Sequence, residues 1–311
     1  LGDVYKRQNQ KYNIYITGSN AKMLSREIAT TLGGRFWNKD IYPYSFAEYL
    51  NARDIILSKN WIYGKQAAEV SKAFNDYFLY GGFPELTDVI AKRVWLNDIY
   101  SKIFFSDLIV RNKVRNEEAL GLLVRRLAEN VKQPVSYTRL ANLISSIGIK
   151  ISKATVIEFI RYLKESCLIF PIENYAAKFA ERNSNMKHYF IDNGLLSIFL
   201  LDGNTSLLEN IVAIHLYKRY GAQLYFYNQN IEVDFVIPEA KTAIQVSYSL
   251  MDETTCRREV EGLIKLNRVF PMDNMCIITR DEERIITHES GVSIHVIPVW
   301  KWLLKEEPLR T

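Results

Sequence analysis

Hydrophobic residues repeat at helical spacing through the first half of the chain, whereas short apolar runs alternate with turns in the last third. Between about residues 66 and 112 this spacing predicts helices, interrupted at residues 80–85 (YGGFPE), where two glycines and a proline favour a turn. After about residue 186 the pattern predicts a mixed α/β region. Its strands are expected near residues 188–195, 223–227, 232–237, 243–248, 275–279 and 293–298, and its helices over residues 207–220 and 255–266.

The N-terminal segment predicts a strand, a turn and a helix of an α/β sheet, followed by another strand over residues 35–41. Residues 12–17 (YNIYIT) form a β-rich run, and residues 18–20 (GSN) lead into a helical pattern that two glycines end. One strand cannot form a sheet, so partner strands are expected upstream. A further helix is predicted to begin within residues 44–50 (YSFAEYL), with Ser45 near its cap.

The middle of the chain predicts a helix-turn-helix. Helices are expected over residues 119–130, 137–147 and 152–167. Apolar residues at the spacing of a helix-turn-helix connect the second and third of these helices. These residues are Leu140, Ala141, Gly148, Val156, Ile160 and Leu163. A β-rich run over residues 168–172 is expected to start a wing.

Composition excludes several classes of protein without selecting one. A chain of 311 residues with 48% hydrophobic and 24% charged residues suits two or three globular domains. A net charge of +5 is too small to indicate nucleic-acid binding by itself. Three cysteines without CxxC spacing predict neither a disulfide framework nor a zinc site. No apolar run approaches the roughly 18 residues of a membrane span, so a cytoplasmic protein is expected.

The first eight residues, LGDVYKRQ, are predicted not to belong to the natural protein. DVYKRQ is what GAT GTG TAT AAG AGA CAG encodes, and this resembles a transposon end used to prepare sequencing libraries. We therefore leave these residues out of the fold prediction.

Seven blocks, in order along nearly the whole chain, resemble one family of ATPases. They are ITGSNAKMLSREIATTLGGR (16–35), YPYSFAEYL (42–50), YGGFPE (80–85), YFIDNGLL (189–196), LLENIVAIHLYKRYG (207–221), EVDFVIP (232–238) and IQVSYSL (244–250). The chain resembles the bacterial and archaeal AAA+-like P-loop ATPases that carry a C-terminal domain of unknown function, number 4143.

The resemblance implies a multidomain α/β chain. The expected parts are the end of an ATPase core (9–55), a helical lid (56–115), a winged helix-turn-helix (116–175) and a restriction-endonuclease-like α/β domain (186–311). In the family, the GxxxxGK[ST] loop and the acidic Mg²⁺-binding strand precede the ITGS strand, and this sequence contains neither. ATP and Mg²⁺ are therefore expected as cofactors of an intact parent ATPase, whereas this chain is expected to be a truncated part that does not hydrolyse ATP.

Two places near the N-terminus are candidates for sensing nucleotide in the parent. Ser19 and Asn20 resemble the polar sensor that orients the attacking water, although Asn20 is equally explained as a helix cap. Arg35 has a guanidinium suited to a phosphate, and the alternative is an exposed loop arginine.

Four cations on or near the third helix of the helix-turn-helix are candidates for DNA contact: Lys150, Lys153, Arg161 and Lys164. Glu158 and Glu165 share that helix and would repel phosphates. A winged helix also serves as a protein-binding module or an ATPase lid, so the expected partner is DNA or protein and not a membrane. The sequence does not indicate the oligomeric state.

The last domain carries part of a metal-dependent nuclease site. Glu209 and Asp234, with Glu232 beside the latter, match the helix and strand carboxylates that hold Mg²⁺ in active enzymes. The next strand has Gln245 where an acid is expected and Ser247 where a lysine is expected. We therefore predict a degenerate nuclease fold kept as a binding module. The alternatives are an active metal-dependent DNA nuclease and a DNA-binding regulator.

Overall fold

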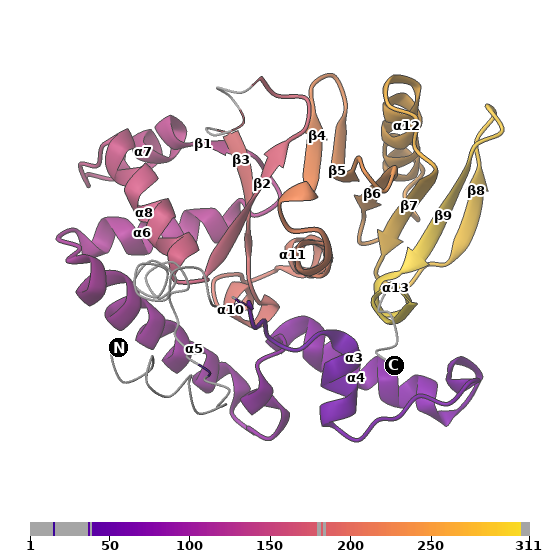
Figure 1. The fold of residues 1–311 in the computed structure, drawn as a ribbon, viewed down its shortest axis with the longest axis horizontal. Coiled ribbons are helices and arrows are strands. Elements are labelled where there is room, and N and C mark those ends of the chain that lie inside the picture. The colour runs from indigo at the N-terminus through magenta and orange to yellow at the C-terminus, as the bar shows by residue number, and fades with distance from the viewer. Residues whose placement is uncertain (1–14, 16–36, 38, 179–181, 183–184, 306–311) are drawn as a thin grey trace, which may run out of the picture.

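A single mixed β-sheet organises the protein. The computed structural model describes residues 15, 37, 39–178, 182 and 185–305. Within them the sheet has nine strands in the order β1-β3-β2-β4-β5-β6-β7-β9-β8 (Figure 1). The strands are β1 (Val135–Ser136), β2 (Ile169–Asn174), β3 (Asn185–Phe190), β4 (Tyr225–Asn228), β5 (Glu232–Ile237), β6 (Thr242–Val246), β7 (Asn274–Thr279), β8 (Arg284–Thr287) and β9 (Ser293–Pro298). The β2/β4, β6/β7 and β7/β9 pairs are parallel, and the other pairs are antiparallel.

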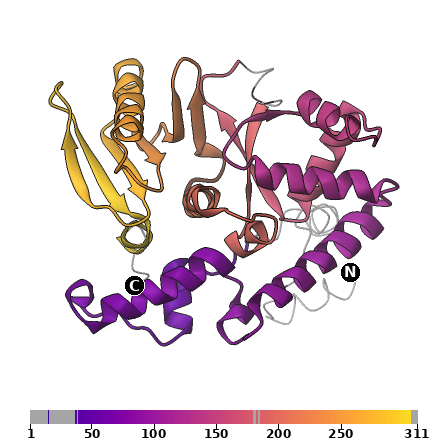
Figure 2. The same cartoon turned by 180° about the vertical axis from the view of Figure 1, so that it is seen from behind.

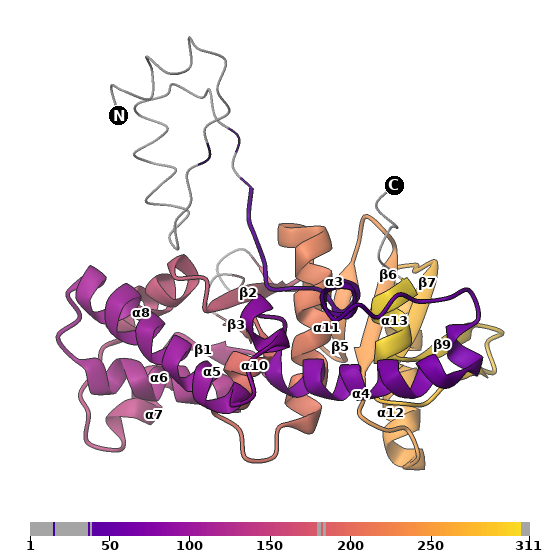
Figure 3. The ribbon, with the colours of Figure 1, turned by 90° about the horizontal axis from the view of Figure 1, so that it is seen from below.

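The first helices lie where the spacing predicts them. They are α3 (Phe46–Ala52), α4 (Lys65–Tyr80) and α5 (Lys92–Lys102), which continues into a π-helical segment (Ile103–Val110). Ser45 caps α3 through a reciprocal bond pair with Glu48, which confirms the expected start of that helix. Gly81, at φ 80°, ends α4 within the predicted YGGFPE break. Figure 3 shows α4 and α5 running lengthwise across the molecule.

Three capped helices follow, as predicted: α6 (Glu117–Glu129), α7 (Tyr137–Ser145) and α8 (Lys153–Glu165). The side chains of Asn116, Ser136 and Ser152 each accept a backbone hydrogen bond from the first turn of the helix that they precede. β1 pairs with β3, and β3 pairs with β2, so these strands form an antiparallel group beside the helices.

The strand predicted to start a wing differs from the expectation. β2 also pairs in parallel with β4, which places it inside the nine-stranded sheet and not on a projecting hairpin. β3, which was assigned to the last domain, pairs with strands of the preceding region. The sheet is therefore continuous across the predicted boundary between residues 175 and 186. The physical reason is burial, since β2 and β3 carry apolar residues that need cover on both faces.

The remaining helices cover the two faces of the sheet: α10 (Asn193–Ser197), α11 (Asn204–Tyr220), α12 (Glu253–Val269) and α13 (Val299–Lys305). Successive residues of β6 point to opposite faces of the sheet. Ile244 packs in the apolar cluster that includes α11 and α13, and Ala243 packs in the one that includes α12. Figures 1 and 2 show α6–α8 at one end of the molecule and α12 with β7–β9 at the other.

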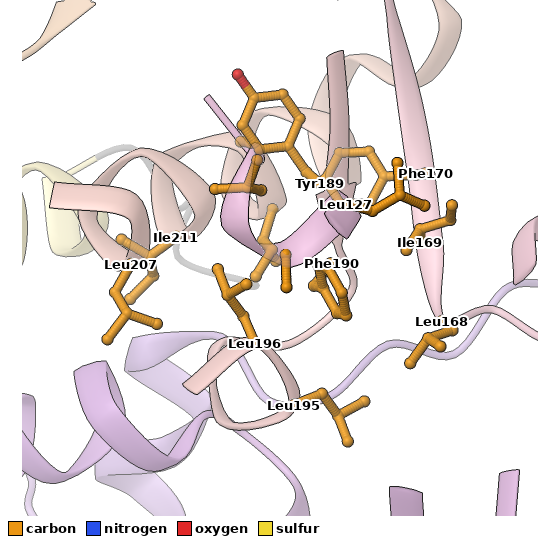
Figure 4. Packing of buried hydrophobic residues seen from close by; sticks show 14 of the residues in the cluster. Leu127, Leu168, Ile169, Phe170, Tyr189, Phe190, Leu195, Leu196, Leu207 and Ile211 are labelled. Carbon is orange, nitrogen blue, oxygen red and sulfur yellow. The ribbon is translucent and has the colours of Figure 1, made fainter. Parts of the chain in front are cut away.

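One large apolar core joins the helical half to the sheet. Figure 4 shows Leu127 of α6 and Phe190 of β3 in the same cluster as side chains from α10 and α11. Leu195, Leu196, Leu207 and Ile211 are each almost fully buried there. No helix of the described chain combines the length and apolarity that crossing a bilayer requires.

Candidate functional site

Three carboxylates from α11 and β5 lie close together. Glu209 comes from the first half of α11, and Glu232 and Asp234 are alternate residues of β5, so their side chains leave the same face of the strand. Together they line a cavity of about 690 Å³ that also reaches α12. The structure therefore brings together the three acidic residues singled out in the sequence.

A lysine that the sequence analysis missed lies at the centre of these carboxylates. Lys187 of β3 has no exposed surface. Its Nζ lies 3.2 Å from a Glu209 oxygen, 3.1 Å from Asp234 Oδ1 and 3.3 Å from Glu232 Oε1. Ser247 stands where a lysine is expected, and Lys187 brings a cation to the carboxylates from another strand. We call Lys187, Glu209, Glu232 and Asp234 the lysine–carboxylate cluster.

One signal in the sequence pointed to Lys187. It interrupts the run Met186, His188, Tyr189 and Phe190, all of which are buried in the structure. A lysine inside a buried strand needs an acidic partner. The partners lie 22 and more residues away, so the sequence alone does not identify them.

Charge and burial oppose each other in this cluster. Burial favours the neutral form of Lys187, but the three carboxylates outweigh it and raise its pKa above the usual value. Burial raises the pKa of Glu209 to about 7, although Lys187 acts in the opposite direction. Tyr189 donates a 2.7 Å hydrogen bond to Glu209. The pKa of the Tyr189 phenol is raised well above its usual value, mainly by burial and next by the charge of Glu209. The carboxylates therefore favour the charged form of Lys187.

Gln245 has a structural task in place of the expected metal contact. Its amide oxygen accepts from the backbone N–H of Asp234 at 2.8 Å, and its amide nitrogen donates to the carbonyl of Glu232 at 3.1 Å. Both bonds fix β5 against β6. Gly262 of α12 lies so close that a Cβ there would be 3.1 Å from the Gln245 nitrogen. Ser247 bonds within its own turn, to the carbonyl of Ser249.

Nothing in the described chain is arranged as a metal centre: no three His, Cys, Asp or Glu side chains there are placed to hold an ion. Glu259 of α12 also lines the cavity but is paired with Arg258 at 2.6 Å. The cluster thus carries its own cation.

The four cations predicted to contact DNA are exposed on one side of α8 and in the turn before it. Lys153, Arg161 and Lys164 follow one another at helical spacing, and Lys150 precedes the helix. Arg161 lies 3.7 Å from Glu158 and stacks on Tyr162, so part of its charge is balanced locally. The nucleotide-sensing candidates Ser19, Asn20 and Arg35 lie outside the described residues.

Family models match two separate parts of the chain. Residues 1–50 match the family model of an AAA domain, which is found in ATPases. Residues 71–206 match a domain of unknown function (DUF8612), a different number from the domain that the sequence resembles. No solved structure matches the chain.

The relatives are archaeal and bacterial. The chain is 32% identical over 315 aligned residues to the uncharacterized protein MJ1544 of Methanocaldococcus jannaschii, covering 97% of this chain and 71% of that protein, and it belongs to the same family. An uncharacterized protein of Haemophilus influenzae is 31% identical over 82% of this chain, and MJ1637 of Methanocaldococcus jannaschii is 24% identical over 75%. The chain spans 63% and 55% of the lengths of these two relatives.

Proposed function

We propose that this chain is part of an AAA+-like P-loop ATPase whose C-terminal half is a non-catalytic binding module. The AAA match over residues 1–50 supports the first statement. The position of Lys187 supports the second. In the whole protein, ATP and Mg²⁺ would act at the P-loop, and the binding module would respond to the nucleotide state.

The lysine–carboxylate cluster carries this proposal. A nuclease of the endonuclease-like fold needs its carboxylates to bind Mg²⁺ at about 2.0–2.1 Å and to leave water in the remaining positions. Here the ammonium of Lys187 lies 3.1–3.3 Å from all three carboxylates and supplies the countercharge that a metal would bring. In its charged form the ammonium has no free electron pair with which to accept a proton from water, which also supports a non-catalytic role.

A cleavage and metal-binding experiment tests the proposal. With Mg²⁺ or Mn²⁺ the chain should leave supercoiled plasmid intact, and calorimetry should detect no Mn²⁺ binding. Lys187→Ala should bind Mn²⁺ at about millimolar concentration, because removal of the ammonium leaves the carboxylates available. Lys301→Ala, which removes a lysine of α13 that pairs with Glu283, is the control and should not bind. Plasmid nicking by the unmodified chain that Asp234→Ala abolishes would instead establish a nuclease.

We propose duplex DNA contact through α8 as a second function of the module. The helices α6, α7 and α8 and the strand order β1-β3-β2 resemble a winged helix, in which the last helix enters the major groove, and this resemblance supports the proposal. The apolar residues of α8 face the core, so its cations face outward. A helix of 13 residues is about 20 Å long, which is enough to follow the groove past several phosphates.

Salt dependence tests whether these four cations contact phosphates. If Lys150, Lys153, Arg161 and Lys164 each neutralise a phosphate, affinity should fall about 150-fold between 50 and 200 mM KCl, with a logarithmic slope of about −3.6. Lys153→Ala/Arg161→Ala should reduce that slope by about 2 when measured by anisotropy with a labelled duplex. Arg257→Ala/Arg268→Ala on α12 removes the same charge elsewhere and should leave the slope unchanged. Equal losses in both variants would contradict contact through α8.

A further inference from the structure

A second buried polar cluster joins the helical half to the start of α10. Asp192 is 3% exposed, and its carboxylate accepts hydrogen bonds from the backbone N–H of Gly82 at 2.7 Å and of Gly194 at 2.8 Å. Gly81 lies so close that a Cβ would be 1.9 Å from Asp192 Oδ1. The YGGFPE segment is thus fitted to this carboxylate through its backbone.

Two asparagines extend these contacts into α11 and β3. Asn193 donates to the carbonyls of Phe78 in α4 and Leu207 in α11, at 2.9 and 3.0 Å. Asn210 donates to Asn193 Oδ1 at 2.9 Å and exchanges two hydrogen bonds with the backbone of Phe190. We call Gly81, Gly82, Asp192, Asn193 and Asn210 the junction.

The junction and the lysine–carboxylate cluster share two elements. On α11, Asn210 of the junction directly follows Glu209 of the cluster. On β3, Phe190 directly follows Tyr189, which donates to Glu209, and Lys187 is three residues before Phe190. Any displacement of α11 relative to β3 therefore changes both sets of hydrogen bonds.

The junction also contacts the C-terminal end of the AAA-matching segment. The backbone N–H of Tyr44 donates to the carbonyl of Gly82 at 2.7 Å, and the hydroxyl of Tyr77 donates to the carbonyl of Tyr44 at 2.9 Å. Lys218 of α11 donates to the carbonyl of Pro43 at 2.6 Å. Residues 43 and 44 lie within the stretch that matches the AAA domain.

We propose that the junction couples the AAA-matching segment to the lysine–carboxylate cluster. The inference rests on the proposed function, in which the AAA part changes state with nucleotide. Its physical basis is that buried backbone-to-carboxylate bonds are either made or lost, since a buried group without its partner is costly. A shift of residues 43 and 44 must carry Gly82 with it, and Asp192 passes that shift to α10, α11 and β3.

Hydrogen exchange followed by mass spectrometry tests the coupling in both directions. Asp192→Asn should speed exchange in residues 206–212 of α11 at least about fivefold, and Lys187→Met should do the same for residues 80–85, because coupling between two sites is reciprocal. The β8–β9 hairpin, residues 284–298, should accelerate clearly less than these segments in both variants. Asp273→Asn, at a surface pair with Lys241, is the control and should alter neither region.

Two outcomes would overturn the coupling. One is faster exchange confined to the side of the molecule that carries the substitution. The other is a uniform increase in every peptide, which is global destabilisation. If Lys187→Met does not fold, Tyr189→Phe takes its place in the comparison, because it removes the hydrogen bond to Glu209. Metal binding by the unmodified chain would contradict the proposed non-catalytic module but would not change these exchange results. Failure of the proposed function and failure of the coupling are therefore distinguishable.

Discussion

Lys187→Met should lower the free energy of unfolding by about 3–5 kcal/mol, because it removes the cation that these carboxylates share. Lys187 Nζ lies within 3.3 Å of Glu209, Glu232 and Asp234, and Glu209 is almost fully buried. Urea unfolding monitored by circular dichroism measures the loss. Lys241→Met breaks an exposed pair with Asp273 and should cost less than about 1 kcal/mol.

The loss should depend on pH in a defined direction. The pKa of Glu209 is raised to about 7 in the folded protein, above its unfolded value, so the native state holds this proton more tightly and the contribution of Glu209 to stability falls as pH rises between about 4.5 and 7. Without Lys187 the carboxylate loses its compensating charge, so the variant should be relatively more stable at pH 5.5 than at pH 8. Lys187→Met/Glu209→Gln should recover part of the loss. Equal losses at both pH values would contradict a role for an uncompensated carboxylate.

Gly81→Ala should lower the free energy of unfolding by about 2–4 kcal/mol. One part of this loss is backbone strain, since Gly81 has φ 80°, where a side chain is disfavoured. The larger part is steric, because the new Cβ would overlap the Asp192 carboxylate, which the N–H groups of Gly82 and Gly194 hold in place. Thermal or urea unfolding provides the measurement.

Two glycines separate these contributions. Gly148 has φ 92° with open space around its Cβ position, so Gly148→Ala should show the backbone effect alone, at about 1 kcal/mol. Gly64 has a negative φ and equally open surroundings, and Gly64→Ala should be close to neutral. A loss in Gly81→Ala no larger than that of Gly148→Ala would show that Asp192 can yield, and the junction would then be less rigid than its hydrogen bonds indicate.

Local structure was predictable wherever it depends on neighbouring residues. Ser45 with Glu48, Ser136 and Ser152 each satisfy backbone groups one turn away, so the helix starts that they signal are found in the structure. The break at residues 80–85 follows from glycine and proline in the same way. The continuity of β2 and β3 with the rest of the sheet was not predictable, because strand pairing depends on partners far along the chain.

The candidate site was likewise predictable in its residue types but not in its contacts between distant elements. The sequence singled out Glu209, Glu232 and Asp234, and it showed that Gln245 and Ser247 depart from a nuclease pattern. It did not reveal that Gln245 fastens β5 to β6, nor that Lys187 lies among the carboxylates. Both depend on distances between elements that no spacing rule contains.

By itself, the sequence determined the positions of most helices and strands, the AAA-like character of the N-terminal segment and the acidic residues of the candidate site. These properties come from short-range periodicity, capping and motif chemistry. Only the tertiary structure decided that a lysine from β3 neutralises those acids and that Asp192 holds the YGGFPE backbone. Each of these arrangements joins groups that are distant in sequence, and burial makes their pairing obligatory only once the sheet has assembled.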